Sequence, residues 1–317
     1  MREEIDLFGS PEVVFGCRHL PAEASGGGVL VCLGPPFDTA VDEGRSARLA
    51  RRLAAAGVVV QRFRSRGTWP SDGDPAELTF DRLVDDARSA LDLLRDRTGV
   101  RQVAFVGARF GALVAARLAR DVPGAPVVLW SPVPDARGAL ELAARARTAR
   151  RAHEATDDRA TGGAPRPAGD PAADDLSDRP PLAPDPLALH LADPPAPEVD
   201  LFDTPLAVDL AGSTVRSLAD ELGAGPRPLL VVDTADDGWA DERETVVASC
   251  RARGVTVDVA KHPCDGERAG RVVPTRSADE LIDDTAAWLV ARLAAPTSPP
   301  HRPDEPGDGP VIPGVAP

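Results

Sequence analysis

Tyrosine is absent from this chain, methionine occurs once, and aromatic residues make up only 4% of the sequence. The basic residues are almost all arginine. Together these biases indicate a GC-rich coding background. A high arginine content is therefore weak grounds for assigning a function.

Cysteine is also scarce, with four residues at Cys17, Cys32, Cys250 and Cys264. Their spacing contains no CxxC pair and no zinc-binding pattern. We therefore predict no metal site, and no cofactor is expected either. Cys17 and Cys32 fall in apolar, strand-like runs, where a free buried thiol is the simplest interpretation. A reducing compartment is expected.

Long apolar runs are missing as well, and none approaches the roughly 20 residues that a membrane-spanning helix needs. The first ten residues, MREEIDLFGS, are charged and lack the apolar core of a signal peptide. The formal net charge of −14 argues against nucleic acid and acidic membrane surfaces as partners. We expect a soluble, cytoplasmic protein.

Strand-like and helix-like segments alternate along the first 130 residues. Short apolar runs typical of buried strands alternate with segments whose apolar residues recur at helical spacing. The expected strands are 11–20, 28–33, 57–60, 103–106 and 127–130, and the expected helices are 45–56, 80–97 and 112–120. This alternation predicts right-handed βαβ units, and so an α/β fold with a doubly wound, mostly parallel sheet.

The alternation stops after residue 130 and returns near the C-terminus. Residues 135–152 are helix-like, whereas residues 154–200 contain ten prolines and eleven acidic residues against three arginines. Such a composition buries too little apolar area to offset chain entropy, which predicts disorder. Order is expected again near Leu206, with strands at 229–232 and 255–259 and helices at 213–222, 241–253 and 277–293.

We therefore divide the chain into four parts. The expected divisions are an N-terminal part of the core (1–152), an acidic, Pro-rich insertion (153–205), a short helix with the C-terminal part of the core (206–295), and a disordered tail (296–317).

One turn between a strand and a helix carries a recognisable pattern, Gly107-Ala108-Arg109-Phe110-Gly111. The nucleophile elbow of hydrolases, Gly-x-Ser-x-Gly, has the same layout and holds its serine in a strained turn above the sheet. Both glycines are expected there, because a Cβ would clash with the neighbouring strand and helix. The central residue here is Arg109 instead of serine.

Other stretches follow the same fold in the right order. Residues 62–74 are similar to the loop after the fourth strand of hydrolases, and residues 229–237 to the late strand and loop that carry the triad acid. Gly34, Pro35 and Pro36 follow the third strand, where that fold places its oxyanion loop. These matches resemble the α/β-hydrolase superfamily, in which the insertion would occupy the cap position.

Within that superfamily, the sequence is similar to the exosortase A system-associated hydrolase 2 group. The resemblance covers roughly residues 5–152 and 206–293, and it rests on four runs: CLGPPF at 32–37, ARFGAL at 108–113, LWSPV at 129–133 and DLAG at 209–212. It implies that arginine in place of the serine is an inherited feature, and it implies a polysaccharide-export context. The Pro-rich insertion has no counterpart in that group.

Acyl transfer in this fold needs a nucleophile, a base and an orienting acid. The guanidinium of Arg109 stays protonated, so it can neither attack an ester nor act as a base. The candidate base is His262, although the usual histidine is expected nearer residues 265–267; the alternative is a histidine at a strand end. Asp236 is the candidate acid, or else a solvated or helix-capping carboxylate.

Two substitute nucleophiles are conceivable, Ser131 after the strand 127–130 and Cys264 beside His262. Arg109 instead suits one of two roles at the start of a helix, where the backbone N–H groups already favour anions. It could pair with a carboxylate such as Asp236 and close the site. It could also bind a carboxylate, a phosphate or an acyl-carrier phosphopantetheine group.

Three functions remain open. The first is a non-catalytic hydrolase-like protein, a pseudoenzyme that binds an anionic or acyl small molecule or a protein partner at the former active site. Its predicted binding residues are Arg109, Phe110, Gly34, Pro35, Pro36 and Ser131. The second is an esterase, thioesterase or acyltransferase that uses non-standard residues. The third is an interaction protein that works through the acidic insertion.

Overall fold

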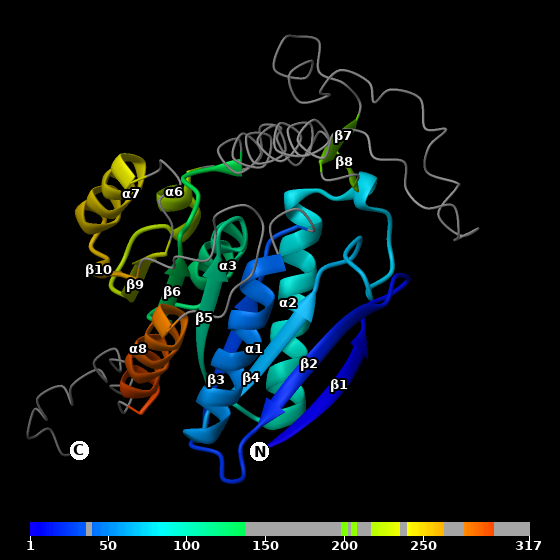
Figure 1. Cartoon of the computed structure of the whole chain (residues 1–317), viewed down its shortest axis with the longest axis horizontal. Helices are drawn as coiled ribbons and strands as arrows, with labels where there is room; N and C mark the ends of the chain where they lie inside the picture. The colour runs from blue at the N-terminus through cyan, green and yellow to red at the C-terminus, as the bar shows by residue number, and fades with distance from the viewer. Residues whose placement is uncertain are drawn as a thin grey trace, which may run out of the picture.

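The computed structural model describes residues 1–35, 40–136, 198–201, 204–207, 217–234, 240–262 and 276–294. These residues form one eight-stranded sheet with the order β1-β2-β4-β3-β5-β6-β9-β10 (Figure 1). The strands are β1 (Arg2–Phe8), β2 (Val14–Leu20), β3 (Gly27–Cys32), β4 (Val59–Arg64), β5 (Gln102–Ala108), β6 (Val127–Trp130), β9 (Pro228–Asp233) and β10 (Thr256–Lys261). All pairs from β4 to β10 are parallel, and β2 is antiparallel to both β1 and β4.

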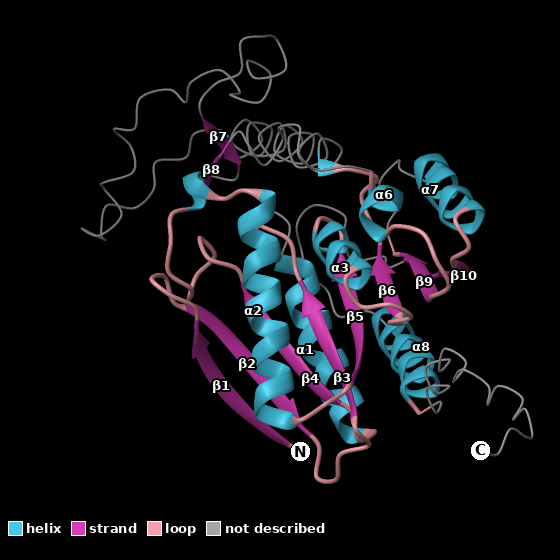
Figure 2. Ribbon diagram, turned by 180° about the vertical axis from the view of Figure 1, so that it is seen from behind, coloured by secondary structure: helices cyan, strands magenta, loops and turns pink. Residues whose placement is uncertain are grey.

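Helices cover both faces of the sheet (Figure 2). One face packs against α1 (Ala40–Ala55) and α8 (Arg276–Leu293), and the other packs against α2 (Phe80–Thr98), α3 (Gly111–Arg120), α6 (Leu218–Leu222) and α7 (Ala240–Ala252). Because both faces are covered, the central strands can be apolar on both sides. The predicted α/β class with a doubly wound, mostly parallel sheet is confirmed.

Helix α2 shows how local sequence sets the limits of an element. The hydroxyl of Thr79 accepts a hydrogen bond from the backbone N–H of Arg82, which satisfies one of the free donors of the first turn. Gly99 ends the helix in the left-handed conformation, where glycine lacks the Cβ penalty. Between them, the apolar residues at helical spacing are buried.

Strand β1 was not predicted, which is a correction to the analysis of residues 1–10. Two of its charged residues face polar or basic partners across the ladder, Glu3 opposite His19 and Glu4 opposite Arg18. An edge strand that is covered on few sides can keep such residues in contact with water. It therefore lacks the apolar run by which strands were identified.

The predicted insertion lies mostly outside the described residues, as do most of the helix expected at 135–152 and the run at 209–212. Its end is an exception. Strands β7 (Glu198–Leu201) and β8 (Thr204–Ala207) form an antiparallel pair, so regular structure begins earlier than the expected restart near Leu206. Such a pair is defined by the hydrogen bonds between its backbones. Because those bonds do not depend on apolar side chains, the pair need not show an apolar pattern in the sequence.

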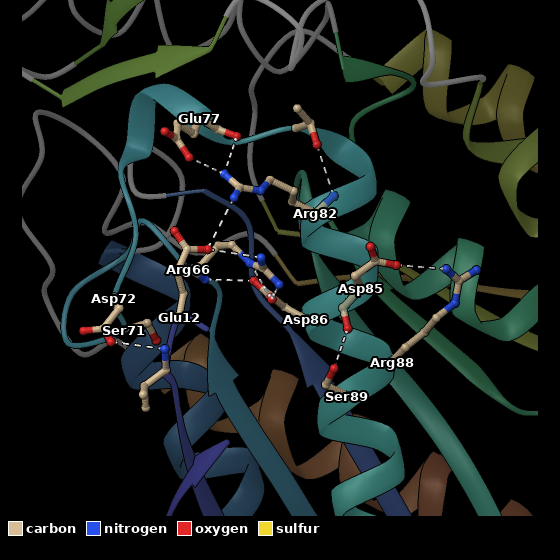
Figure 3. Close-up of polar contacts among 12 residues, drawn as sticks. Glu12, Arg66, Ser71, Asp72, Glu77, Arg82, Asp85, Asp86, Arg88 and Ser89 are labelled. Atoms are coloured by element: carbon tan, nitrogen blue, oxygen red, sulfur yellow. Dashed lines mark hydrogen bonds and ion pairs between the residues drawn. The ribbon is translucent and has the colours of Figure 1, made fainter. Parts of the chain in front are cut away.

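A buried ion pair anchors the loop that follows β4 (Figure 3). The carboxylate of Asp86 is 1% exposed and accepts hydrogen bonds from the backbone N–H and the guanidinium of Arg66, at 2.6–2.8 Å. Glu12 contacts the same guanidinium at 3.1 Å. The hydrogen bond to Asp86 raises the pKa of Arg66. The loop is thereby fixed to α2 at the edge where the parallel strands end.

None of the helices in the described ranges is both long and apolar enough to cross a membrane.

Candidate functional site

The carboxyl ends of β3, β5, β6 and β9 meet at one edge of the sheet, which is where open α/β sheets bind ligands. Four of the residues that follow these strands are described here: Gly34, Arg109, Ser131 and Thr234. Because the strands are neighbours in the sheet, the loop residues that follow them lie side by side at this edge. The sequence-predicted residues Gly34, Pro35, Arg109 and Ser131 are brought to this edge together.

The turn between β5 and α3 has the strained geometry expected of an elbow. Arg109 has a φ of 48°, a conformation that costs a non-glycine residue roughly 1–3 kcal/mol. Its backbone N–H donates to the carbonyl oxygen of Trp130 on β6 at 2.9 Å, which holds the turn against the neighbouring strand. The residue at the tip is thus positioned by the backbone alone.

Both glycines of the turn are required by close packing. A Cβ on Gly107 would lie 2.6 Å from the Cα of Ala112, and a Cβ on Gly111 would lie 2.3 Å from the carbonyl oxygen of Cys32. Neither backbone atom can move without shifting β3 or α3. The steric role expected for the two glycines is therefore seen in the structure.

The side chain of Arg109 contacts a buried carboxylate from α1. Its Nε lies 3.3 Å from Oδ2 of Asp42, and Oδ1 of Asp42 accepts a hydrogen bond from Arg45 at 3.1 Å. Asp42 is 3% exposed, and the side chain of Arg109 is 14% exposed. Two guanidinium groups therefore flank one carboxylate, with a combined charge of +1.

Asp42 is a site residue that the sequence analysis missed. Asp236, the partner suggested for Arg109, lies outside the described residues. The sequence feature that could have indicated Asp42 is its spacing from Arg45, which places an acidic and a basic residue on the same side of the first turns of a helix. That helix follows the loop at Gly34 and Pro35, so its first residues return to the sheet edge.

Ser131 is at the edge, but its hydroxyl is already engaged. Its φ is 39° and the residue is 2% exposed. The Oγ atom lies 2.6 Å from Oγ1 of Thr234 and accepts a hydrogen bond from the backbone N–H of Thr234 at 2.9 Å. A nucleophilic serine would instead be paired with a base. The contacts join the ends of β6 and β9.

His262 follows the edge strand β10, three strands away from β5 in the sheet. Its Nε2 lies 3.1 Å from Oδ2 of Asp284 on α8, and its backbone N–H donates to the carbonyl oxygen of Asp233. The ring is therefore directed to a helix on the face of the sheet opposite α3. This geometry favours a strand-end histidine over a base for a group at Arg109.

Two further predicted binding residues have restricted roles. The ring of Phe110 is fully buried and packs edge-to-face against Phe80 at 6.4 Å, so only the backbone of Phe110 is left to take part in the predicted binding. Pro35 has no backbone N–H to donate to an oxyanion, and Pro36 lies outside the described residues.

Comparison with known proteins agrees with this geometry. Residues 41–161 match the family model described as serine aminopeptidase, S33. Two uncharacterized proteins of Mycobacterium tuberculosis are each 38% identical over 121 residues, which is 37% of this chain. The match covers only 41% of the length of either relative.

Solved structures are similar over nearly the whole chain. A putative hydrolase from Agrobacterium vitis has a TM-score of 0.54 at 16% identity and covers 91% of this chain and 100% of its own. Est1E from Butyrivibrio proteoclasticus, solved with ferulic acid, has a TM-score of 0.58 at 15% identity, with 92% and 100% covered. A thermostable carboxyl esterase from Bacillus coagulans has a TM-score of 0.56 at 14% identity, with 92% and 99% covered.

Identity at this level shows the fold, and the family model adds a sequence match across α1, β4, α2, β5, α3 and β6. The chain has the α/β-hydrolase fold, and the findings together support its place in the α/β-hydrolase superfamily.

Proposed function

We propose that this protein is a hydrolase-like protein without serine-hydrolase activity, and that it binds an anionic or acyl small molecule at the sheet edge around Arg109. The observation that carries the proposal is Arg109 itself, at a φ of 48° in the turn between β5 and α3. We propose that this is the nucleophile position of the fold, and that the relationship to the exosortase A system-associated hydrolase 2 group explains the arginine there.

The chemistry of the neighbouring groups supports the loss of acyl transfer. A guanidinium is not a nucleophile at any working pH. The hydroxyl of Ser131 is bound to Thr234, and the ring of His262 is bound to Asp284. Pro35 offers no N–H to a developing oxyanion. Among the residues that the structure describes, the candidate hydroxyl and the candidate base are thus held in other contacts.

The charge at the edge supports an anionic ligand. Arg109 and Arg45 both contact Asp42, so two guanidinium groups meet at this edge. A ligand carboxylate or phosphate can share these donors with Asp42 or replace it, because guanidinium groups bind such anions in the same bidentate way.

The first test is labelling of the whole purified protein with a fluorophosphonate probe, read by intact mass. We expect no adduct on the wild type, because the probe needs an activated hydroxyl or thiol. The Arg109→Ser variant is treated alongside, with an active serine esterase as the reagent control. If only the variant is labelled, the arginine at position 109 is the reason why the wild type does not react.

A stoichiometric adduct on the wild type would overturn the proposal. Mapping that adduct by peptide mass spectrometry would then identify a non-standard nucleophile, with Ser131 and Cys264 as the first residues to inspect. The protein would in that case be an esterase, thioesterase or acyltransferase.

A second prediction concerns binding. We expect inorganic phosphate or butyrate to raise the thermal midpoint of the wild type, and we expect Arg109→Gln to abolish that rise. Arg88→Gln, which removes an exposed guanidinium from α2, serves as the charge-matched control. Equal responses of the wild type and Arg109→Gln would show that the anion binds elsewhere.

A further inference from the structure

Three side chains with metal-binding donor atoms meet on the β1–β2 pair, away from the edge described above. Glu3 on β1 lies directly opposite His19 on β2, and Cys17 is two residues before His19 and so projects from the same face of the strand. His19 is in register with Val60, near the start of β4. The cluster is therefore distant from the carboxyl ends of the parallel strands.

The sulfur–nitrogen distance within this cluster suits a small tetrahedral ion. The Sγ of Cys17 lies 3.6 Å from Nε2 of His19, which is the ring nitrogen that would share an ion with the thiolate. Oε1 of Glu3 lies 3.3 Å from the other ring nitrogen, Nδ1, so the Glu3 side chain would have to turn toward Nε2 to join them. One donor atom from each of the three residues lies within 4.8 Å of the others. A zinc ion with Zn–S of about 2.3 Å and Zn–N of about 2.0 Å sets sulfur and nitrogen about 3.6 Å apart.

The burial of the cluster indicates a built site with an entrance. His19 is fully buried, and its Nδ1 lies 3.3 Å from the carboxylate of Glu3 without an assigned hydrogen bond. Cys17 is half-buried, and the side chain of Glu3 is 36% exposed.

We propose that Cys17, His19 and Glu3 form a binding site for Zn²⁺ or a metal ion of similar preference. A thiolate, an imidazole and a carboxylate are all donors that zinc accepts, and three protein ligands leave a fourth position for water or another small ligand. On binding, the thiol proton of Cys17 passes to solvent and the sulfur bonds to the metal. This departs from the prediction of no metal site, which considered only spacing along the chain.

The charges around the cluster define what the fourth ligand would be. A zinc ion, a thiolate and a carboxylate together are neutral. Two arginines lie close: Arg51 donates to Oε1 of Glu3 at 2.8 Å, and the charge of Arg62 acts on both Cys17 and His19. Arg51 must share Glu3 with the ion, and both guanidinium groups favour an anion, such as hydroxide or chloride, in the fourth position.

The test uses the whole protein, freed of metal by a chelator and titrated with Co²⁺ as a spectroscopic substitute for Zn²⁺. We expect one equivalent of Co²⁺ to bind and to give the charge-transfer absorption of a thiolate ligand. Addition of Zn²⁺ should displace the cobalt and remove that absorption. The readout is independent of any activity at Arg109.

Variants then locate the site. Cys17→Ser should abolish the charge-transfer absorption, and Glu3→Gln should weaken metal binding at least tenfold. Both side chains are partly exposed, so both variants should keep the circular-dichroism spectrum of the wild type. Cys264→Ser is the matched control, because Cys264 follows His262 at the same spacing as His19 follows Cys17.

Two results would overturn the proposal. One is the absence of thiolate–cobalt absorption from the wild type. The other is absorption that survives Cys17→Ser and disappears in Cys264→Ser, which would assign the metal to the other cysteine.

Discussion

Replacing Gly111 by alanine is expected to destabilise the protein by about 3 kcal/mol or more, because the new Cβ would lie 2.3 Å from the carbonyl oxygen of Cys32. The clash is between two main chains, so rotation of a side chain cannot relieve it. Either β3 or the start of α3 must move, and both are buried, since β3 lies within the sheet and α3 packs against one face of it.

Urea unfolding followed by circular dichroism measures this loss. The control is Gly44→Ala in α1, where nothing lies within 4 Å of the added Cβ. There, the higher helix propensity of alanine should stabilise the protein by up to about 1 kcal/mol. If Gly111→Ala unfolds at the same urea concentration as the wild type, then α3 does not approach β3 as closely as the structure shows.

The second large effect is expected at the buried ion pair after β4 (Figure 3). Asp86→Ala should cost about 3 kcal/mol, since it leaves the guanidinium and the backbone N–H of Arg66 without their shared partner. We take the low end of the range for buried pairs because the side chain of Arg66 is 19% exposed. Asp86→Asn should lose less, because an amide oxygen can still accept one bond.

A surface pair between the same helix and the end of α3 provides the comparison. Arg88 and Asp121 lie 3.1 Å apart, with side chains 44% and 54% exposed. Asp121→Ala should change the free energy of unfolding by no more than about 1 kcal/mol, because water screens the exposed charges. Similar losses for Asp86→Ala and Asp121→Ala would show that the loop after β4 gains no stability from its buried anchor.

The difference between these two pairs also shows which contacts can be predicted from the sequence and which cannot. The loop at 62–74 is recognisable by its similarity to a hydrolase loop, but its anchor, Asp86, lies 20 residues away from Arg66 on the buried side of α2. Charged residues are frequent along α2, and the sequence does not distinguish the buried one from its exposed neighbours Asp81 and Asp85.

Local patterns succeed where neighbouring residues set the structure. The run at 127–130 is predicted with the bounds that β6 has, and the helix at 80–97 differs from α2 by one residue. Both are continuous in sequence, and their apolar periodicity is a direct consequence of the layer that they pack against. Strand β1 fails the same test because it lies at the edge, where most of its side chains stay exposed and need not be apolar.

The sequence by itself determined the α/β class, the elbow with its two glycines, and the arginine between them, since these depend on residues adjacent in the chain. Only the tertiary structure decided which groups meet: Asp42 from α1 at Arg109, Thr234 at Ser131, and Glu3 opposite His19. The physical reason is that each of these contacts joins segments that are far apart in sequence. Their distance is set by strand order, register and helix packing, and no local pattern records it.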